Sequence, residues 1–212
     1  SLRKGVLWHD GDEFTSADVK ASFDRIIFPR EGLISIRQGI FPTVTEINTP
    51  NKYTVNFKLS EPLAPASMMA AFSAEWNQIH KKSVIDAADG NLREGDDKPG
   101  TGPFKYVSWD QDKWIQEANP DYWNPKVPYV DGITHLWLKA WSPELSAAML
   151  GGLVDWGMWI APAEGRTIGE RPGLNQLRQS RFVLNVININ TERPGFSDAR
   201  VRRALNLAID RR

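Results

Sequence analysis

The sequence predicts a mixed α/β fold, and three observations carry this prediction. Segments in which apolar and polar residues alternate, as they do in strands, are interleaved with segments in which apolar residues recur every three or four positions, as they do in helices. Glycine and proline mark the junctions between these segments. The 212 residues are 41% hydrophobic, which is enough for one substantial core or two small ones, and the absence of cysteine excludes disulfides.

The first segment, LRKGVLWHDGDEFTSADVKASFDRI, predicts a short strand, a turn and a helix. Asp10-Gly11 is the turn dipeptide, and Thr15 with Asp18 three residues later has the spacing of a capping box. The acidic residues beside His9 resemble a metal cluster at first sight. Turn and cap geometry explains them one at a time, so we expect scaffolding here and no metal site.

The middle of the chain predicts a hairpin in TVTEINTPNKYTVNFKLSEP, two helices in ASMMAAFSAEWNQIHKKSVIDA and a second hairpin in GPFKYVSWDQDKWIQEA. The polar stretch ADGNLREGDDKPG predicts a surface loop, in which Asp96 and Asp97 lack the alternating oxygen ligands of a calcium site. The glycines on either side of Thr101 precede a strand and lack the Gly-Lys-Ser/Thr of a phosphate-binding loop. We therefore expect neither calcium nor nucleotide.

The last third predicts strand, helix and strand, an order that favours parallel pairing. YVDGITHLWLKAW has the two-sided apolar pattern of a buried strand, with His135 as a hydrogen-bonded core or edge residue. Ser142 is placed to begin a helix that Gly151 ends, and GGLVD leads into the next strand. A strand over Arg181–Asn190 and a helix capped by Ser197 follow.

The balance of charged residues argues against binding to nucleic acid or to an anionic membrane. Lys plus Arg and Asp plus Glu both number 26, so no global field attracts nucleic acid or an anionic membrane. No stretch approaches 18 apolar residues, so we expect no membrane-spanning helix. The first residues lack the apolar core of a signal peptide, and the amphipathic ALNLAIDRR ends without a cap. We expect both ends to be cuts within a larger protein.

Four segments, in this order, resemble the extracytoplasmic solute-binding proteins of the peptide and nickel class, bacterial solute-binding protein family 5. They are VLWHDGDEFTSADV, GTGPFKYV with EANPDYW, GGLVD, and VININTERPGFSDARVRRAL, and Ala118 stands where the class usually has Arg. The resemblance implies a type II periplasmic-binding-protein-like lobe with an inserted small α+β domain, as a fragment of a two-lobe protein. Residues 1–108 would form most of the inserted domain and residues 109–212 part of lobe one, with the second lobe absent.

The resemblance also implies the function, which is the receptor component of an ABC importer that captures a solute between two lobes, most of all a peptide. It implies a periplasmic or extracytoplasmic location, a membrane permease as partner and no cofactor. Oligosaccharides, which suit the nine Trp of the chain, and nickel complexes stay open as alternatives, as does a fragment that only docks on the permease. A hydrolase ranks lower, because no Ser-His-Asp order, nucleophile elbow or His-Glu-x-x-His occurs and no catalytic residue is expected.

The candidate ligand-binding residues lie where the class points strand ends between its lobes. They are Trp156, Met158 and Trp159 after GGLVD, and Asn188 and Asn190 in VININ. A core role stays open for the tryptophans, and a turn role for Asn190. Because the interlobe surface of an isolated lobe faces water, we expect this chain either to self-associate or to be marginally stable.

Overall fold

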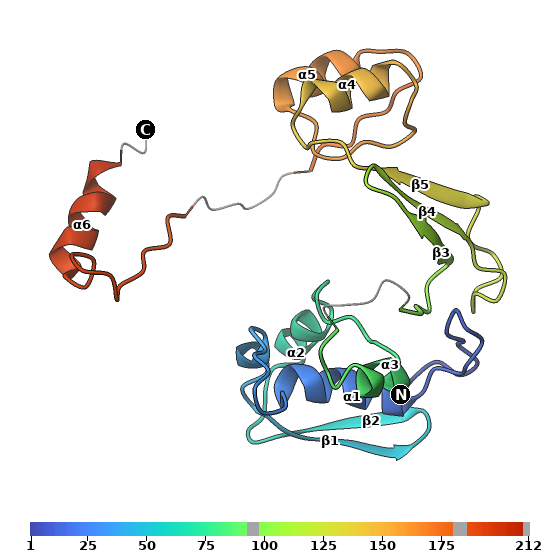
Figure 1. Cartoon of the computed structure of the whole chain (residues 1–212), viewed down its shortest axis with the longest axis vertical. Helices are drawn as coiled ribbons and strands as arrows, with labels where there is room; N and C mark the ends of the chain where they lie inside the picture. Colours follow the sequence, from blue (N-terminus) through green and yellow to red (C-terminus); the bar gives the residue numbers. More distant parts are fainter. Residues whose placement is uncertain (93–97, 180–185, 210–212) are drawn as a thin grey trace. The chain divides into compact units, whose positions relative to one another are not determined.

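The computed structural model describes residues 1–92, 98–179 and 186–209 and divides the chain into two compact units, Ser1–Trp137 and Leu138–Arg212. The first unit contains α1 (Ser16–Ile27), the 3-10 helix η1 (Gln38–Ile40), β1 (Val44–Asn51), β2 (Thr54–Leu59), α2 (Pro65–Phe72), α3 (Lys82–Ala87), β3 (Phe104–Trp109), β4 (Lys113–Ala118) and β5 (Gly132–Leu136). The second contains α4 (Pro143–Leu150), α5 (Pro162–Gly169) and α6 (Ala199–Ala208). The predicted mixed α/β class is confirmed (Figure 1).

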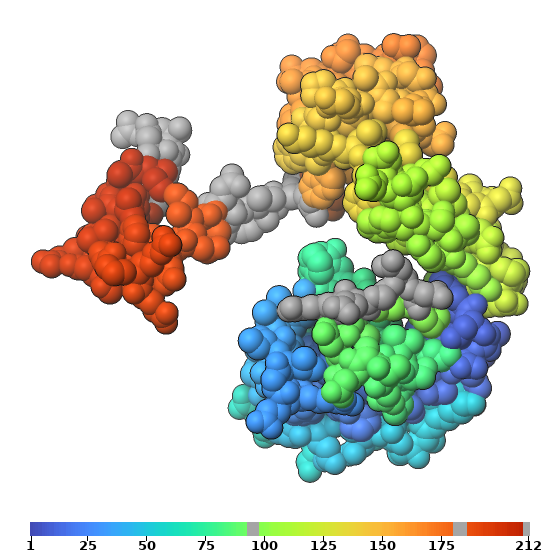
Figure 2. Space-filling view, viewed as in Figure 1, coloured from blue at the N-terminus to red at the C-terminus, as the bar shows by residue number. Residues whose placement is uncertain are grey.

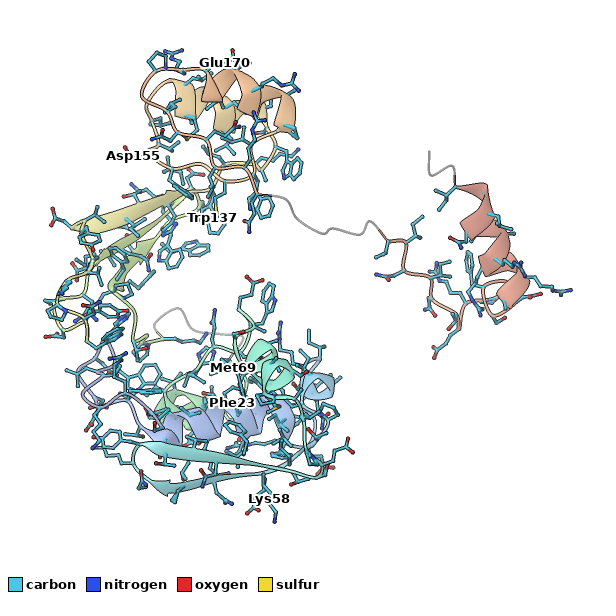
Figure 3. The ribbon with its side chains drawn as sticks, turned by 180° about the vertical axis from the view of Figure 1, so that it is seen from behind. Phe23, Lys58, Met69, Trp137, Asp155 and Glu170 are labelled. Carbon is cyan, nitrogen blue, oxygen red and sulfur yellow. The ribbon has the colours of Figure 1, made fainter. Side chains whose placement is uncertain are left out.

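The core of the first unit lies between α1 and the antiparallel hairpin β1–β2, in which Ile47 of β1 pairs with Phe57 of β2. Phe23 of α1 stands edge-on to the rings of Phe41, Phe57 and Phe72, with centroid distances of 5.3–5.7 Å (Figure 3). Burying such rings removes a large apolar area from water, and the edge-to-face geometry adds to it. In the space-filling view, α1, the hairpin and α2 form one packed body (Figure 2).

The turn and the helix predicted at the start of the first unit are confirmed, but the short strand before them was wrong: among the described residues, only an isolated bridge between Leu7 and Glu13 forms there. The capping box at α1 is formed, because the Thr15 side chain accepts from the first turn and the Asp18 carboxylate accepts from the Thr15 amide at 2.8 Å. The first hairpin and the two helices α2 and α3 are confirmed. Asp96 and Asp97 lie outside the described residues.

The second sheet is antiparallel throughout, in the order β3-β4-β5. The predicted hairpin β3–β4 is confirmed, but the prediction for β5 was wrong in two respects. Its one described neighbour is the antiparallel β4, and it is largely exposed on both faces. His135 of β5 is exposed too; it stacks on Trp114 and bonds to Gln116 at 3.0 Å. This exposure differs from that of a strand in an α/β layer, which is buried on both faces.

In the second unit, α4 and α5 pack together through Leu145, Ala148 and Ile168. The predicted cap of α4 is confirmed, since the Ser142 hydroxyl accepts from the Leu145 amide at 3.4 Å, and Gly151 ends the helix. The expected strand after GGLVD is absent from the described residues 152–161, which form an irregular link. Gly152 and Trp159, at the two ends of this link, adopt positive φ, a backbone conformation outside the strand region.

Helix α6 begins one residue later than predicted, because the side chain of Asp198, and not of Ser197, accepts from the Arg200 amide at 2.8 Å. Of the strand expected over Arg181–Asn190, residues 181–185 lie outside the described residues and 186–190 are irregular. Val201 and Leu205 on the apolar stripe of α6 are exposed, so self-association of this chain stays a prediction. None of the described helices is both long enough and apolar enough to cross a membrane.

Candidate functional site

Two of the four matched segments meet in a hydrogen-bonded group formed by His9, Gly100, Gly102, Pro103 and Asn119, here called the His9 cluster. The His9 amide donates to the Gly100 carbonyl at 2.8 Å, and the Gly100 amide donates to His9 Nδ1 at 3.2 Å. Because Nδ1 accepts, the proton of the ring is assigned to Nε2, which donates to the Gly102 carbonyl at 3.0 Å. Both ring nitrogens of His9 are therefore engaged with backbone.

Asn119 completes the His9 cluster from the start of the NPDYW motif. Its side-chain amide donates to the same Gly102 carbonyl at 3.0 Å, and its backbone amide donates to the Pro103 carbonyl at 2.8 Å. The side chain of Asn119 is 4% exposed, so these bonds are shielded from water. A Cβ added at Gly100 would lie 3.1 Å from His9 Cε1, so glycine allows the close approach of the ring. The family-like segments thus hydrogen-bond the start of the chain to the residues that directly precede β3.

The acidic residues near His9 have cation partners. Lys81 Nζ lies 2.5 Å from both Asp10 and Asp12, and Glu13 bonds to Lys52 and to the Tyr53 hydroxyl. Partial burial acts to raise the pKa of Asp10, but hydrogen bonds from Lys81 and the Asp12 amide outweigh it and hold that pKa below its usual value. Nowhere in the described parts of the chain do three or more His, Cys, Asp or Glu side chains gather in a metal-binding group.

The three predicted residues after GGLVD lie on the irregular link between α4 and α5, near Asp155 (Figure 3). Trp156 is 72% exposed, Met158 61% and Trp159 46% within the described residues. The ligand-binding role and the core role of the tryptophans both stay predictions. Exposed indoles offer flat apolar area with one hydrogen-bond donor each, which suits ligand contact.

Trp141, which sequence reasoning missed, joins this group. Its amide donates to the Trp159 carbonyl at 2.9 Å, and the two indole rings are nearly parallel, 14° apart with centroids at 6.4 Å. Both tryptophans have φ of 64°, a conformation that costs a bulky residue about 1–3 kcal/mol and that clusters at functional sites. The sequence signal is weak: an aromatic residue directly before the Ser142 cap.

Asn188 and Asn190 belong to another described stretch, residues 186–209. Both are exposed. The Asn190 side chain accepts from the Glu192 amide at 2.9 Å, and its carbonyl accepts from the Arg193 amide at 3.3 Å. The turn role left open for Asn190 is therefore confirmed.

Comparison with known proteins gives a consistent result. The model of the family described as bacterial extracellular solute-binding proteins, family 5 Middle, matches residues 1–212. The glutathione-binding protein GsiB of Pectobacterium atrosepticum is 26% identical over 99% of this chain and 40% of its own length. The chain thus spans about two fifths of the length of this curated relative.

Solved structures show the same fold. The periplasmic binding protein DppA of Helicobacter pylori, in complex with the peptide STSA, is similar with a TM-score of 0.66 and 27% identity, over 81% of this chain and 36% of that one. NikZ of Campylobacter jejuni, in complex with Ni(L-His), has a TM-score of 0.71 at 24% identity, over 99% of this chain and 41% of that one. The predicted type II binding-protein lobe is in agreement with both.

Proposed function

The chain belongs to the bacterial extracellular solute-binding proteins of family 5, and from this premise we propose that the whole protein captures a peptide between two lobes and presents it to the permease of an ABC importer. The observation that carries the proposal is the match of the family model to residues 1–212. Among the similar proteins, GsiB is named as glutathione-binding and DppA was solved with the peptide STSA, two ligands that share peptide chemistry, whereas NikZ was solved with Ni(L-His). The proposal includes a periplasmic or extracytoplasmic location.

The mechanism is a shift between an open and a closed state. A ligand that contacts both lobes favours the closed state by the difference between its affinities for the two states, and the permease recognises the closed state. A peptide offers its backbone and termini to polar groups at every length, while water in the side-chain pockets tolerates different sequences. No covalent step is needed, so a peptide leaves the protein unchanged.

In this proposal Trp141, Trp156, Met158 and Trp159 line the wall that this chain contributes to the cleft. The exposure of all four residues supports this proposal. The positive φ of Trp141 and Trp159 supports it too, because strained backbone of this kind clusters at functional sites. Asn188 and Asn190 supply amide groups for a peptide backbone, although the Asn190 oxygen is already used in its turn. The assignment of residues 1–108 to an inserted domain and 109–212 to lobe one is likewise a proposal; its boundary falls inside β3.

The test is a ligand screen on the full-length protein by calorimetry and thermal shift, with di- to nonapeptides, glutathione, oligosaccharides and nickel–histidine. We expect saturable binding and a higher melting temperature with peptides. Mass spectrometry of the bound peptide after prolonged incubation should return it intact. Cleavage products would overturn the binding-protein proposal, whereas stabilisation by oligosaccharides or nickel–histidine alone would overturn the peptide as solute.

A further inference from the structure

A hollow of about 550 Å³ lies between α1 and α3 in the first unit, within the volume range of small-molecule sites. Its apolar lining comes from one face of α1 and from the segments around α3: Ala17, Ala21, Phe28, Leu33 and Ile85. None of its lining residues is among those assigned above to the solute cleft. The hollow is therefore a separate feature that the proposed function does not use.

Most charged side chains in the lining are paired with one another or with a neighbour. Lys20 contacts Asp24 at 2.8 Å within α1, and Lys82 contacts Asp86 within α3. Arg30 contacts Asp89. These pairs neutralise the rim of the hollow without any ligand.

Arg25 is the exception. Its side chain is half-buried, its Nε atom is buried without a hydrogen-bond partner, and within the described ranges of the chain no carboxylate pairs with it. Burial lowers the pKa of Arg25, yet a guanidinium stays protonated at neutral pH. A desolvated cation without a counter-charge destabilises the folded protein, and an anion arriving from solution would remove that cost.

We propose that this hollow binds a small organic carboxylate, with its carboxylate on the Arg25 guanidinium and its apolar part against Ala21, Phe28 and Ile85. The fork of N–H donors on a guanidinium matches the two oxygens of a carboxylate, and an apolar tail gains from leaving water for this lining. An inorganic anion would gain only the first of these contacts. The hollow is a second ligand site of the protein, independent of the solute cleft.

The test is calorimetric titration of the full-length protein with phenylacetate, with phenylacetamide as the neutral control of the same size and shape. For a ligand of about ten heavy atoms we expect a Kd near 1 mM. Phenylacetamide should bind at least about tenfold more weakly. Arg25→Gln should weaken phenylacetate binding at least about tenfold, whereas Lys20→Gln, which removes a rim cation that has its own partner, should change it less than about twofold.

Two further measurements separate a binding role from a structural one. Without ligand, Arg25→Gln should melt at the same temperature as the parent or higher, because it removes a charge without a partner. Ala21→Leu should fill the hollow and abolish phenylacetate binding while leaving peptide affinity unchanged. Phenylacetate binding and peptide binding are measured separately, so a failure of the carboxylate site can be told apart from a failure of the proposed peptide capture. The proposal is overturned by the absence of saturable binding up to about 10 mM, by equal affinity in Arg25→Gln, or by a clear loss of melting temperature in that variant.

Discussion

Replacing His9 by Ala would open the His9 cluster, and the loss can be worked out from its bonds. The Gly100 amide loses its acceptor at 3.2 Å, and the Gly102 carbonyl loses one of two donors while keeping Asn119 at 3.0 Å. Two side-chain hydrogen bonds contribute about 1 kcal/mol each, and a part-buried amide left without a partner adds about 1–2 kcal/mol. We therefore expect His9→Ala to lower the free energy of unfolding by about 3–4 kcal/mol.

The assay is urea unfolding of purified protein, with the melting temperature as a second reading. For a domain of this size, the expected loss corresponds to a melting temperature lower by roughly 5–15 °C. His135→Ala is the matched control, since His135 is exposed and bonds only to a neighbouring side chain; we expect it to cost less than about 1 kcal/mol. Peptide affinity of the folded His9→Ala protein should stay within about twofold of the parent, because the cluster is structural.

Gly100→Ala extends this test as a double-mutant cycle. Its new Cβ would press on the His9 ring at 3.1 Å, so alone it should destabilise the protein, and much of that cost should vanish when His9 is also Ala. Equal stabilities of His9→Ala and His135→Ala would refute this reasoning. A fall in peptide affinity as steep as the fall in stability would instead place His9 at the solute.

Three other outcomes are expected. Burial, together with the charges of Arg25 and Lys98, lowers the pKa of His80 below 6.5, so the unfolded chain binds the proton more tightly than the folded one and stability should fall as the pH drops below about 6.5. His80→Gln should reduce the difference between the urea midpoints at pH 7 and pH 5, and the same difference in the variant and the parent would contradict this expectation. Asp18→Ala removes the acceptor of the Thr15 and Lys82 amides, both at 2.8 Å, and should cost about 2–4 kcal/mol in urea unfolding, whereas a cost below about 0.5 kcal/mol would show the cap to be dispensable. Trp156→Ala should weaken peptide binding by about 1–3 kcal/mol in calorimetry with little change in melting temperature, and the reverse pattern would make Trp156 a packing residue.

Features that depend on neighbours in the sequence could be predicted from the sequence. The capping box of Thr15 and Asp18, the hairpins and the Ser142 cap each need only residues within a few positions of one another. A short segment of sequence therefore contains all the residues needed to predict them. The family motifs also lie in the sequence, and with them the fold class and the kind of function.

Predictions from short sequence segments were wrong where the local structure depends on backbone conformation or on residues far away in the sequence. The link after GGLVD has apolar residues that favour a strand, but Trp159 adopts a positive φ that a strand does not have. The sequence around Trp159 gives no sign of this conformation. Helix α5 begins with Pro162 in a stretch with few apolar residues, so its periodicity is weak and the helix was missed. The cap of α6 moved from Ser197 to Asp198 because both side chains suit the role and only the local backbone chooses between them.

The sequence by itself determined the α/β class, the helix caps within one turn, the family and the structural character of the acidic cluster at His9. Only the tertiary structure decided that His9 meets Gly100, ninety-one residues away, that Trp141 stacks beside Trp159, and that Arg25 lines a hollow and has no carboxylate partner within the described residues. The physical reason is the same in each case. Hydrogen bonds, ring contacts and burial form between groups that folding brings together, and a linear pattern carries no record of which distant groups those will be.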